Sequence, residues 1–354
     1  MNPVLKKILL ALGAMFFLLL ILEGTSSVVL SCTGQQVLKD RNNPIRGRKG
    51  VVNVFQFDEE LGWSYRPDTH SPDYYGEGLS MTTNSRGMRS TYEHTGEIPE
   101  GKYRVICLGD SFTMGWGVSD DETFPHFLEE STETIEAVNM GCGAYGAQQC
   151  YLWYLRDGLE LETDVLLLCV INDDFRRMAP RNKSADGTPR PIVDVHDGEL
   201  QLTRPMSARK VVSKRNPVIR FLKDLSIYRL LLSWARQSYD QKSVAEAHFA
   251  PASEAMFRDL ARRSRERSQK FYLVYLPTLW ELPDRSRLLN TWLREFLKEE
   301  GIGLIDLSTT FAALSPSERR TLYLPDGHFS VFGTRMASKG IIEGLRRLDA
   351  EFPE

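Results

Sequence analysis

The sequence predicts an α/β fold, specifically a three-layer α/β/α sandwich around a central, mostly parallel five-stranded sheet. Two observations predict it. From residue 102 onward, short apolar segments alternate with segments of helical character, which is the order expected when each parallel strand is followed by a helix. The apolar segments are also almost continuously hydrophobic, as in DVLLLCVI at 164–171. Such runs are typical of strands covered on both faces.

The individual elements follow from this alternation. Strands are expected at 103–108, 135–140, 164–171, 270–277 and 303–307. Helices are expected at 122–133, 148–159, 285–300 and 333–348. The stretch between the third and fourth strands, about 176–269, is too long for a bare loop. We therefore expect a helical insertion there, over the carboxyl end of the sheet, with a helix at 218–237 that begins after Asn216-Pro217.

The residues before the sandwich differ in composition. Residues 33–50 are polar and basic without periodicity, which is typical of a linker next to a membrane. Residues 51–100 are rich in Gly, Pro, Asn and Tyr, which indicates loops and short strands rather than a long helix. We expect an anchor segment at 1–32, a linker and short-strand extension at 33–100, and a main domain at 101–350.

The amino terminus carries a targeting signal. Lys6-Lys7 precedes an apolar run over 8–22, whose length is typical of a signal-peptide core. Read through to Leu30, the segment is long enough to span a membrane with some tilt. The lysines place the amino terminus in the cytoplasm and the remainder outside it. Cleavage, retention as a transmembrane helix, and lipidation at Cys32 stay open, although Val29-Leu30-Ser31 matches the lipidation signal poorly.

Charge and cysteine content argue against two functional classes. With 44 basic and 47 acidic residues, the net charge of −3 gives no global field that would mark a nucleic-acid-binding protein. The chain has no Cys-x-x-Cys pair and no His-rich tract, so a structural zinc module is not expected. Five cysteines do not suggest a disulfide framework, and a pair between Cys142 and Cys150 is left open.

Four polar pieces stand at predicted strand ends or just before the last helix. They lie at 109–115, 139–146, 172–173 and 326–328. Because the carboxyl ends of parallel strands meet at one edge of the sheet, where active sites of open α/β sheets collect, we expect these pieces to lie close together.

These pieces resemble the motif blocks of the SGNH hydrolase superfamily, the GDSL-like lipases and acylhydrolases, over about residues 100–350. The resemblance implies a flavodoxin-like sandwich, with Ser111 of Gly-Asp-Ser as the nucleophile. It implies that Asp326 and His328 are the acid and the base. Many members space these residues as Asp-x-x-His, whereas Pro325 occupies that acid position here and Asp326 lies two before the histidine.

The other two blocks match in part. The family's Gly-x-Asn-Asp block ends as Asn172-Asp173 here, with Val170 in place of its glycine. A main-chain donor lies five residues after the family's block asparagine, which corresponds to Ala144, with Gly143 one residue earlier. The segments at 57–63 and 84–89 also resemble those of exported bacterial members.

The chemistry of these residue types agrees with the resemblance. A serine hydroxyl is a weak nucleophile until a histidine removes its proton, and an acid orients that histidine. His328 is then the base for Ser111, and Asp326 holds its far ring nitrogen. Attack on an ester creates an oxyanion that needs preplaced donors, worth roughly 3–4 kcal/mol each. The candidate donors are the main-chain N–H groups of Ser111 and of Ala144 or Gly143, and the side chain of Asn172.

Some nearby residues have simpler interpretations. Asp110 is expected to brace the turn rather than do chemistry. Asp306 is the best substitute for Asp326 as the acid, but a helix cap before Ser308 is the favoured interpretation. The histidines His126 and His196 are expected to be exposed bystanders, and His248 is the other histidine considered.

The resemblance and the amino-terminal segment together imply a membrane-tethered serine esterase of the SGNH type. Its catalytic domain is expected outside the cytoplasm, in a bacterial periplasm or at the cell surface. Its substrate would be an O-acyl ester, above all O-acetyl, of a cell-envelope carbohydrate or lipid. No cofactor, metal or nucleic-acid partner is implied, and the oligomeric state is unspecified. Two alternatives stay open: an O-acyltransferase of the same architecture, and a non-catalytic envelope protein that binds or scaffolds. The basic run at 204–223 has two interpretations. One is a lid that contacts a membrane or a glycan, and the favoured one is a solvated basic face.

Overall fold

The computed structural model divides into two compact units, which are described separately. One unit comprises Met1–Lys39 and Val212–Val244, and the other comprises Asp40–Val211 and Ala245–Glu354. The residues that the structure describes are 2–32, 53–178, 189–196, 199–203, 225–228, 230–231, 250–279, 281 and 291–353.

The larger unit is built on a five-stranded sheet in which every neighbouring pair is parallel. Its strands are β5 (Tyr103–Gly109), β6 (Ile135–Gly141), β7 (Val165–Val170), β10 (Lys270–Tyr275) and β11 (Gly303–Asp306). The spatial order is β11-β10-β7-β5-β6, so the first strand lies between the second and the third. This order confirms the predicted α/β fold class. The chain reverses direction across the sheet between β5 and β7, and ligand sites in such sheets lie at that point.

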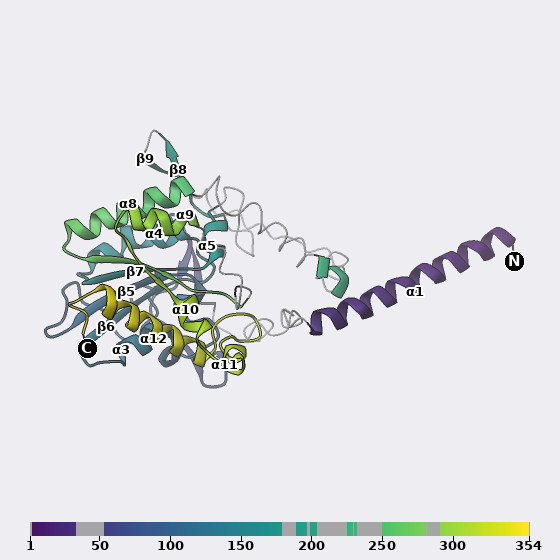
Figure 1. Cartoon of the computed structure of the whole chain (residues 1–354), viewed down its shortest axis with the longest axis horizontal. Helices are drawn as coiled ribbons and strands as arrows, with labels where there is room; N and C mark the ends of the chain where they lie inside the picture. The colour runs from purple at the N-terminus through teal and green to yellow at the C-terminus, as the bar shows by residue number, and fades with distance from the viewer. Residues whose placement is uncertain are drawn as a thin grey trace. The chain divides into compact units, whose positions relative to one another are not determined.

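Alternate residues of each strand face opposite helical layers. On β5, Ile106 and Leu108 belong to one buried cluster and Val105 and Cys107 to the other. The first layer consists of α4 (Ala147–Arg156), α8 (Ala250–Glu266) and α9 (Thr291–Glu299). The second consists of α3 (Phe124–Glu129), α10 (Leu307–Ala312) and α12 (Val331–Leu348), as Figure 1 shows. Because both faces are covered, the strands are apolar at nearly every position.

The expected strands agree with the observed ones to within about two residues, but several helices are shorter. The helix expected at 122–133 is a 3-10 turn, η3 (Asp120–Glu122), followed by α3. The two are separate because Thr123 caps α3, accepting the N–H of His126, and Pro125 stands in its first turn. Residues 282–290, the start of the helix expected at 285–300, lie outside the described residues.

The range expected to form an insertion is described only in part. It contains a hairpin of β8 (Ile192–His196) and β9 (Glu199–Thr203), and also α8, which contacts α4 and β10. Most of the helix expected at 218–237 and all of the basic run at 204–223 lie outside the described residues.

The short-strand extension packs on the loop that follows β6. It consists of two hairpins, β1 (Phe55–Asp58) with β2 (Gly62–Tyr65), and β3 (Thr69–Gly76) with β4 (Leu79–Thr83). The indole N–H of Trp63 donates to the carbonyl of Gly143 at 3.0 Å. The Gln149 amide donates to the carbonyl of Leu61 at 2.7 Å. The extension and the sandwich therefore share one buried hydrogen-bond framework.

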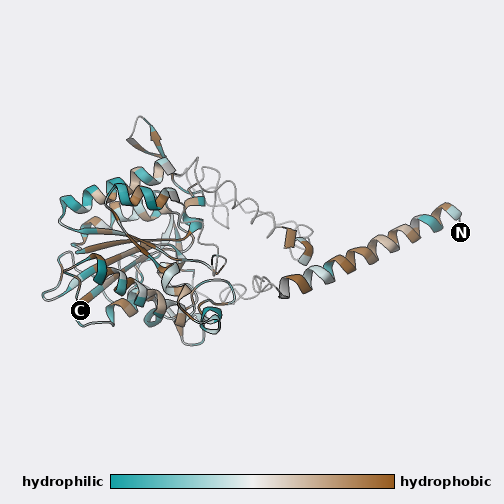
Figure 2. Cartoon of the chain, viewed as in Figure 1, coloured by the Kyte–Doolittle hydropathy of each residue, from teal (hydrophilic) through white to brown (hydrophobic). Residues whose placement is uncertain are grey.

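The smaller unit contains α1 (Pro3–Cys32). Its stretch Pro3–Val29, 27 residues with an 18-residue window of mean hydropathy 2.4, is the one described helix long and apolar enough to cross a membrane, judged by length and composition. Figure 2 shows this helix as hydrophobic over most of its length. The carboxylate of Glu23 accepts the main-chain N–H groups of Ser226 at 2.6 Å and Ile227 at 3.1 Å. An apolar helix of this kind is compatible with a signal sequence or an anchor.

Candidate active site

Ser111 stands directly after β5, as the first residue of the short helix α2 (Ser111–Met114). Asp110 caps this helix, because its Oδ1 accepts the N–H of Phe112 at 2.8 Å. The Ser111 side chain is only slightly exposed, and its Oγ lies 2.9 Å from Nε2 of His328. A hydroxyl at this distance from an imidazole nitrogen can pass its proton to it.

His328 and Asp326 come from the turn between α11 (Pro316–Thr321) and α12. Gly327 adopts φ +94°, a left-handed conformation that glycine tolerates best, and the turn places both side chains on the Ser111 side. Asp326 Oδ1 lies 3.3 Å from His328 Nδ1. The approach is close enough for an ion pair, but Nδ1 makes no aligned hydrogen bond with any described residue.

The charge of Asp326 is stabilised despite its burial. Burial alone would raise the pKa of this carboxyl, but the nearby imidazole of His328 and the hydrogen bond from the His328 main-chain N–H outweigh it and hold the pKa below its usual range. The indole N–H of Trp116 adds to this effect by donating to Oδ2 at 3.0 Å. Asp326 is therefore ionised at neutral pH, as the acid of a triad must be.

The candidate oxyanion donors differ in how they are engaged. Ser111 is the first residue of α2, so its N–H has no acceptor within the helix. Ala144 adopts φ +63°, and its carbonyl accepts Nη2 of Arg190 at 2.9 Å. The N–H of Gly143 donates to the Tyr65 hydroxyl at 3.0 Å. The N–H of Gly143 is therefore already engaged by another residue of the protein.

Asn172, the fourth candidate, begins α5 (Asn172–Arg176) at the end of β7. Its side-chain amide donates to the Tyr275 hydroxyl at 3.1 Å and also to the carboxylate of Glu281. Glu281 is buried, and burial raises its pKa. Both amide hydrogens of Asn172 are thus engaged within the protein.

Sequence reasoning missed Arg177, which joins two motif blocks. Its Nη1 donates to Asp110 Oδ2 at 2.8 Å, to Asp174 Oδ1 at 2.7 Å and to the carbonyl of Tyr145 at 2.7 Å. Burial and the charge of Asp110 raise the pKa of Asp174, and the Arg177 charge opposes this. The three-residue spacing of Asp174 and Arg177 is a signal for a helical ion pair. Nothing in the sequence connects that pair to Asp110.

Trp116 was also missed, although it belongs to the same Gly-rich segment as Ser111. Besides its hydrogen bond to Asp326, its ring centroid lies 5.8 Å from that of His328. The ring of Phe112 lies 5.0 Å from His328. The imidazole therefore contacts two aromatic side chains that follow Ser111 in sequence.

The simpler interpretations of three other residues agree with the structure. Asp306 caps α10, since its Oδ1 accepts the N–H of Ser308 at 2.9 Å, and it also pairs with Arg294. His126 and His196 contact Glu130 and Asp194, at 3.3 and 3.7 Å, and both histidines are partly or largely exposed. His248 lies outside the described residues.

The cysteines of the larger unit are buried, free thiols. They are Cys107, Cys142, Cys150 and Cys169, so the pair left open between Cys142 and Cys150 is not formed. Within the described part of the chain, no group of three or more His, Cys, Asp and Glu side chains is arranged to hold a metal ion.

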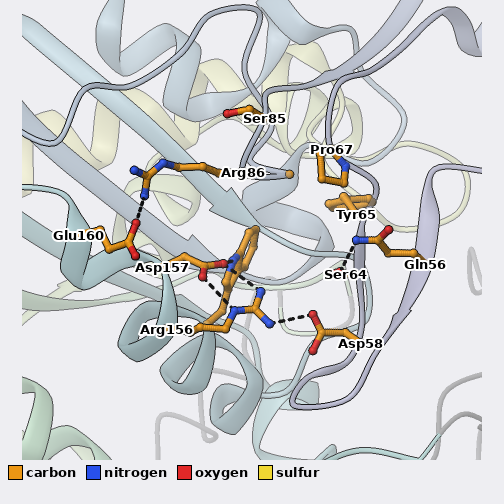
Figure 3. Close-up of a pocket in the computed structure, with 12 residues that line it drawn as sticks. Gln56, Asp58, Ser64, Tyr65, Pro67, Ser85, Arg86, Arg156, Asp157 and Glu160 are labelled. Carbon is orange, nitrogen blue, oxygen red and sulfur yellow. Dashed lines mark hydrogen bonds and ion pairs between the residues drawn. The ribbon is translucent and has the colours of Figure 1, made fainter.

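A separate cavity of about 280 Å³ lies between the extension and the end of α4 (Figure 3). Its charged groups are paired with one another: Arg156 with Asp58 and Asp157, and Arg86 with Glu160. None of Ser111, Asp326 and His328 lines it. Tyr65 lines this cavity, and its hydroxyl accepts the N–H of Gly143.

Comparisons with known proteins give a likeness of fold. No family model matches the sequence, and no curated protein matches it. A member of the lipolytic protein G-D-S-L family from Veillonella parvula has 15% identity and a TM-score of 0.40, covering 69% of this chain and 99% of that one. An acetylxylan esterase from Geobacillus stearothermophilus has 13% identity and a TM-score of 0.39, covering 70% and 94%. The chain is thus structurally similar, at low identity, to G-D-S-L lipolytic proteins and acetylxylan esterases.

Proposed function

We propose that this protein is an SGNH-type serine esterase with Ser111 as its nucleophile. The observation that supports this most directly is the 2.9 Å contact between Ser111 Oγ and His328 Nε2. An ionised Asp326 beside the other ring nitrogen completes the order acid, base and nucleophile.

The reaction then proceeds through an acyl-enzyme. His328 Nε2 takes the Ser111 proton as Oγ attacks the ester carbonyl, and Asp326 stabilises the imidazolium that forms. When the tetrahedral intermediate collapses, the C–O bond to the alcohol breaks and His328 returns the proton to the leaving oxygen. Water, deprotonated by His328, next attacks the acyl-enzyme. It releases the carboxylic acid and free Ser111, so no cofactor takes part in these steps.

The oxyanion is stabilised first by main-chain donors. The N–H groups of Ser111 and Ala144 are the two proposed donors, because the N–H of Gly143 already binds Tyr65. Asn172 becomes a third donor when the carboxylate of Glu281 releases its amide. A substrate oxyanion would compete with the Glu281 carboxylate for the amide N–H of Asn172.

The proposed substrate is an O-acyl ester, above all O-acetyl, of a cell-envelope carbohydrate or lipid. Support comes from α1, whose apolar length suits a membrane anchor. Lys6 and Lys7 before it favour a cytoplasmic amino terminus and an active site outside the cytoplasm.

The test uses the full-length protein in detergent with p-nitrophenyl acetate and butyrate. Ser111→Ala and His328→Ala should each lower kcat by at least about 10³-fold, and Ser111→Ala should abolish labelling by a fluorophosphonate. His126→Ala is the matched control, because His126 is a partly exposed histidine that pairs with Glu130. Turnover that survives Ser111→Ala would overturn the proposal.

One observation favours a second candidate, a non-catalytic binding protein of the same fold. The Gly143 N–H and the Asn172 amide both have internal partners, as in a site not used for catalysis. In that case the unmutated protein is not labelled by the fluorophosphonate and does not hydrolyse the p-nitrophenyl esters.

An acyltransferase of the same fold would be labelled by the fluorophosphonate. It would release acetate only slowly until an acceptor alcohol is added.

A further inference from the structure

We propose that Trp116 is a positioning residue for the triad acid: its indole N–H fixes the carboxylate of Asp326 against His328. The inference rests on the proposed esterase function. Nε1 of Trp116 donates to Asp326 Oδ2 at 3.0 Å. The other oxygen, Oδ1, accepts the main-chain N–H of His328 at 3.2 Å and lies 3.3 Å from its Nδ1. Each carboxylate oxygen therefore has its own fixed donor.

The short spacing between acid and base makes such a donor necessary. With one residue between them, the Asp326 carboxylate must fold back along its own turn to reach Nδ1. That nitrogen forms no aligned hydrogen bond with any described residue, so it does not orient the carboxylate strongly. The terminal torsion of an aspartate is broad. Without the indole, the carboxylate can therefore rotate away from the imidazole.

The backbone around Trp116 is built to present the indole. Gly115 and Gly117 have φ of +88° and +86°, conformations that other residues rarely adopt. A Cβ on Gly117 would lie 2.5 Å from Leu324, just before the Asp326 turn. The N–H groups of Gly115 and Trp116 both donate to the carbonyl of Ser111, at 3.1 and 2.9 Å. The acid's donor is thus anchored on the nucleophile's own residue.

The extension secures this loop from behind through Arg89, the last residue of the segment at 84–89. Its guanidinium donates to the carbonyls of Met114, Gly115 and Val118 at 2.8, 2.6 and 2.8 Å. The Arg89 side chain is almost fully buried and also pairs with Asp120 at 2.9 Å. Main-chain groups before and after Trp116 are therefore held by one side chain, which explains why this arginine lies in the interior.

The decisive variant is Trp116→Phe, which keeps an aromatic ring against His328 and removes the N–H. We expect kcat to fall about 10- to 100-fold, the range that loss of a hydrogen bond to a charged group gives. KM should change less than about twofold, because the indole is proposed to act through the acid rather than on the substrate. The rate constant of fluorophosphonate labelling should fall with kcat, while the labelled fraction at completion stays the same. A merely structural role would lower that fraction instead.

The matched control is Trp292→Phe. The indole N–H of Trp292 donates to the Glu254 carboxylate at 2.7 Å, and its ring stacks on Phe296 in the α9 layer. The same substitution there removes the same kind of hydrogen bond away from Ser111. We expect its kcat and labelling rate to match those of the unmutated protein.

A double-mutant cycle separates action through Asp326 from any other role. In an Asp326→Ala background, Trp116→Phe should cause no further loss of kcat, because residues that act through one contact are not additive. Fully additive losses would overturn this inference alone. So would a kcat of Trp116→Phe equal to that of the unmutated protein while Ser111→Ala is inactive. Undiminished turnover in Ser111→Ala would instead overturn the proposed esterase function.

Discussion

The two sides of the candidate site are in different states. On the acid and base side, Ser111, His328 and Asp326 already lie in contact, and Trp116 and the main chain brace them. On the oxyanion side, Gly143 and Asn172 are engaged by other residues of the protein. Under the proposed function, this difference teaches that the proposed nucleophile, Ser111, is prepared before substrate arrives. Full stabilisation of the proposed oxyanion, in contrast, requires one internal hydrogen bond to be exchanged.

The largest expected effect is on the assembled side. Asp326→Asn should lower kcat by about 10³- to 10⁴-fold, because the amide no longer stabilises the imidazolium and favours the wrong tautomer. Steady-state hydrolysis of p-nitrophenyl acetate measures it. Asp306→Asn is the control: asparagine caps a helix about as well as aspartate, so the α10 cap should be kept and kcat should be unchanged. If Asp306→Asn were the inactive variant, the acid would be Asp306 and not Asp326.

A second effect concerns the ion-pair cluster that joins both sides. Arg177→Met leaves the buried carboxylates of Asp110 and Asp174 without their partner, which should cost about 3–5 kcal/mol of unfolding free energy at pH 7. The pKa of Asp174 is already raised in the folded state and should rise further. The folded state then binds protons more tightly than the unfolded state, so stability falls as the pH rises from about 4 towards the raised pKa.

Thermal unfolding of Arg177→Met at pH 5, 6 and 7 checks this sign. The difference in unfolding temperature between the variant and the unmutated protein should shrink as the pH falls. A difference that is constant across this range would show that the arginine acts through packing and not through the two carboxylates.

The oxyanion side gives a third, intermediate effect. Glu281→Ala frees the Asn172 amide, so kcat should rise by about 3- to 10-fold. Asn172→Ala should then cost little in the unmutated protein and about 3- to 10-fold in the Glu281→Ala background, because it removes only what the freed amide had gained. Kinetics of the four proteins of this cycle provide the measurement. Equal losses in both backgrounds would mean that Glu281 does not restrain Asn172.

The smallest effect is expected at Ala144, whose φ of +63° is unfavourable for a residue with a Cβ. Ala144→Gly removes this strain at the cost of some unfolded-state entropy, so the unfolding free energy should rise by up to about 1 kcal/mol. The main-chain N–H is retained, so kcat should stay the same. Urea unfolding measures the change in unfolding free energy, and ester hydrolysis measures kcat. A large fall in kcat would show that the alanine methyl group itself shapes the site.

The sequence was sufficient where a local pattern carries the information. Continuous apolar runs such as 164–171 predicted the parallel strands, since burial on both faces leaves no room for alternation. The polar pieces at strand ends predicted that Ser111 and His328 would meet across 217 residues of chain. Asp306 was correctly interpreted as a helix cap, because a cap depends only on its neighbours.

The sequence was insufficient where two distant segments meet without a pattern. The engagement of Gly143 by Tyr65 and of Asn172 by Glu281 joins residues 78 and 109 positions apart. Each depends on how a short hairpin or a turn packs, and short strands carry little register information. Arg177 was missed for the same reason, since its partner Asp110 belongs to a different strand end.

The burial of Arg89 has a consequence for anyone who divides this protein into modules. A change of composition near residue 100 invites a cut there, yet the side chain that holds the loop after Ser111 comes from the other side of that cut. A shortened protein that begins at residue 101 would lose this guanidinium and leave three buried carbonyls without their donor. A chimera that joins this candidate site to a different membrane anchor therefore needs the chain from about residue 53 onward.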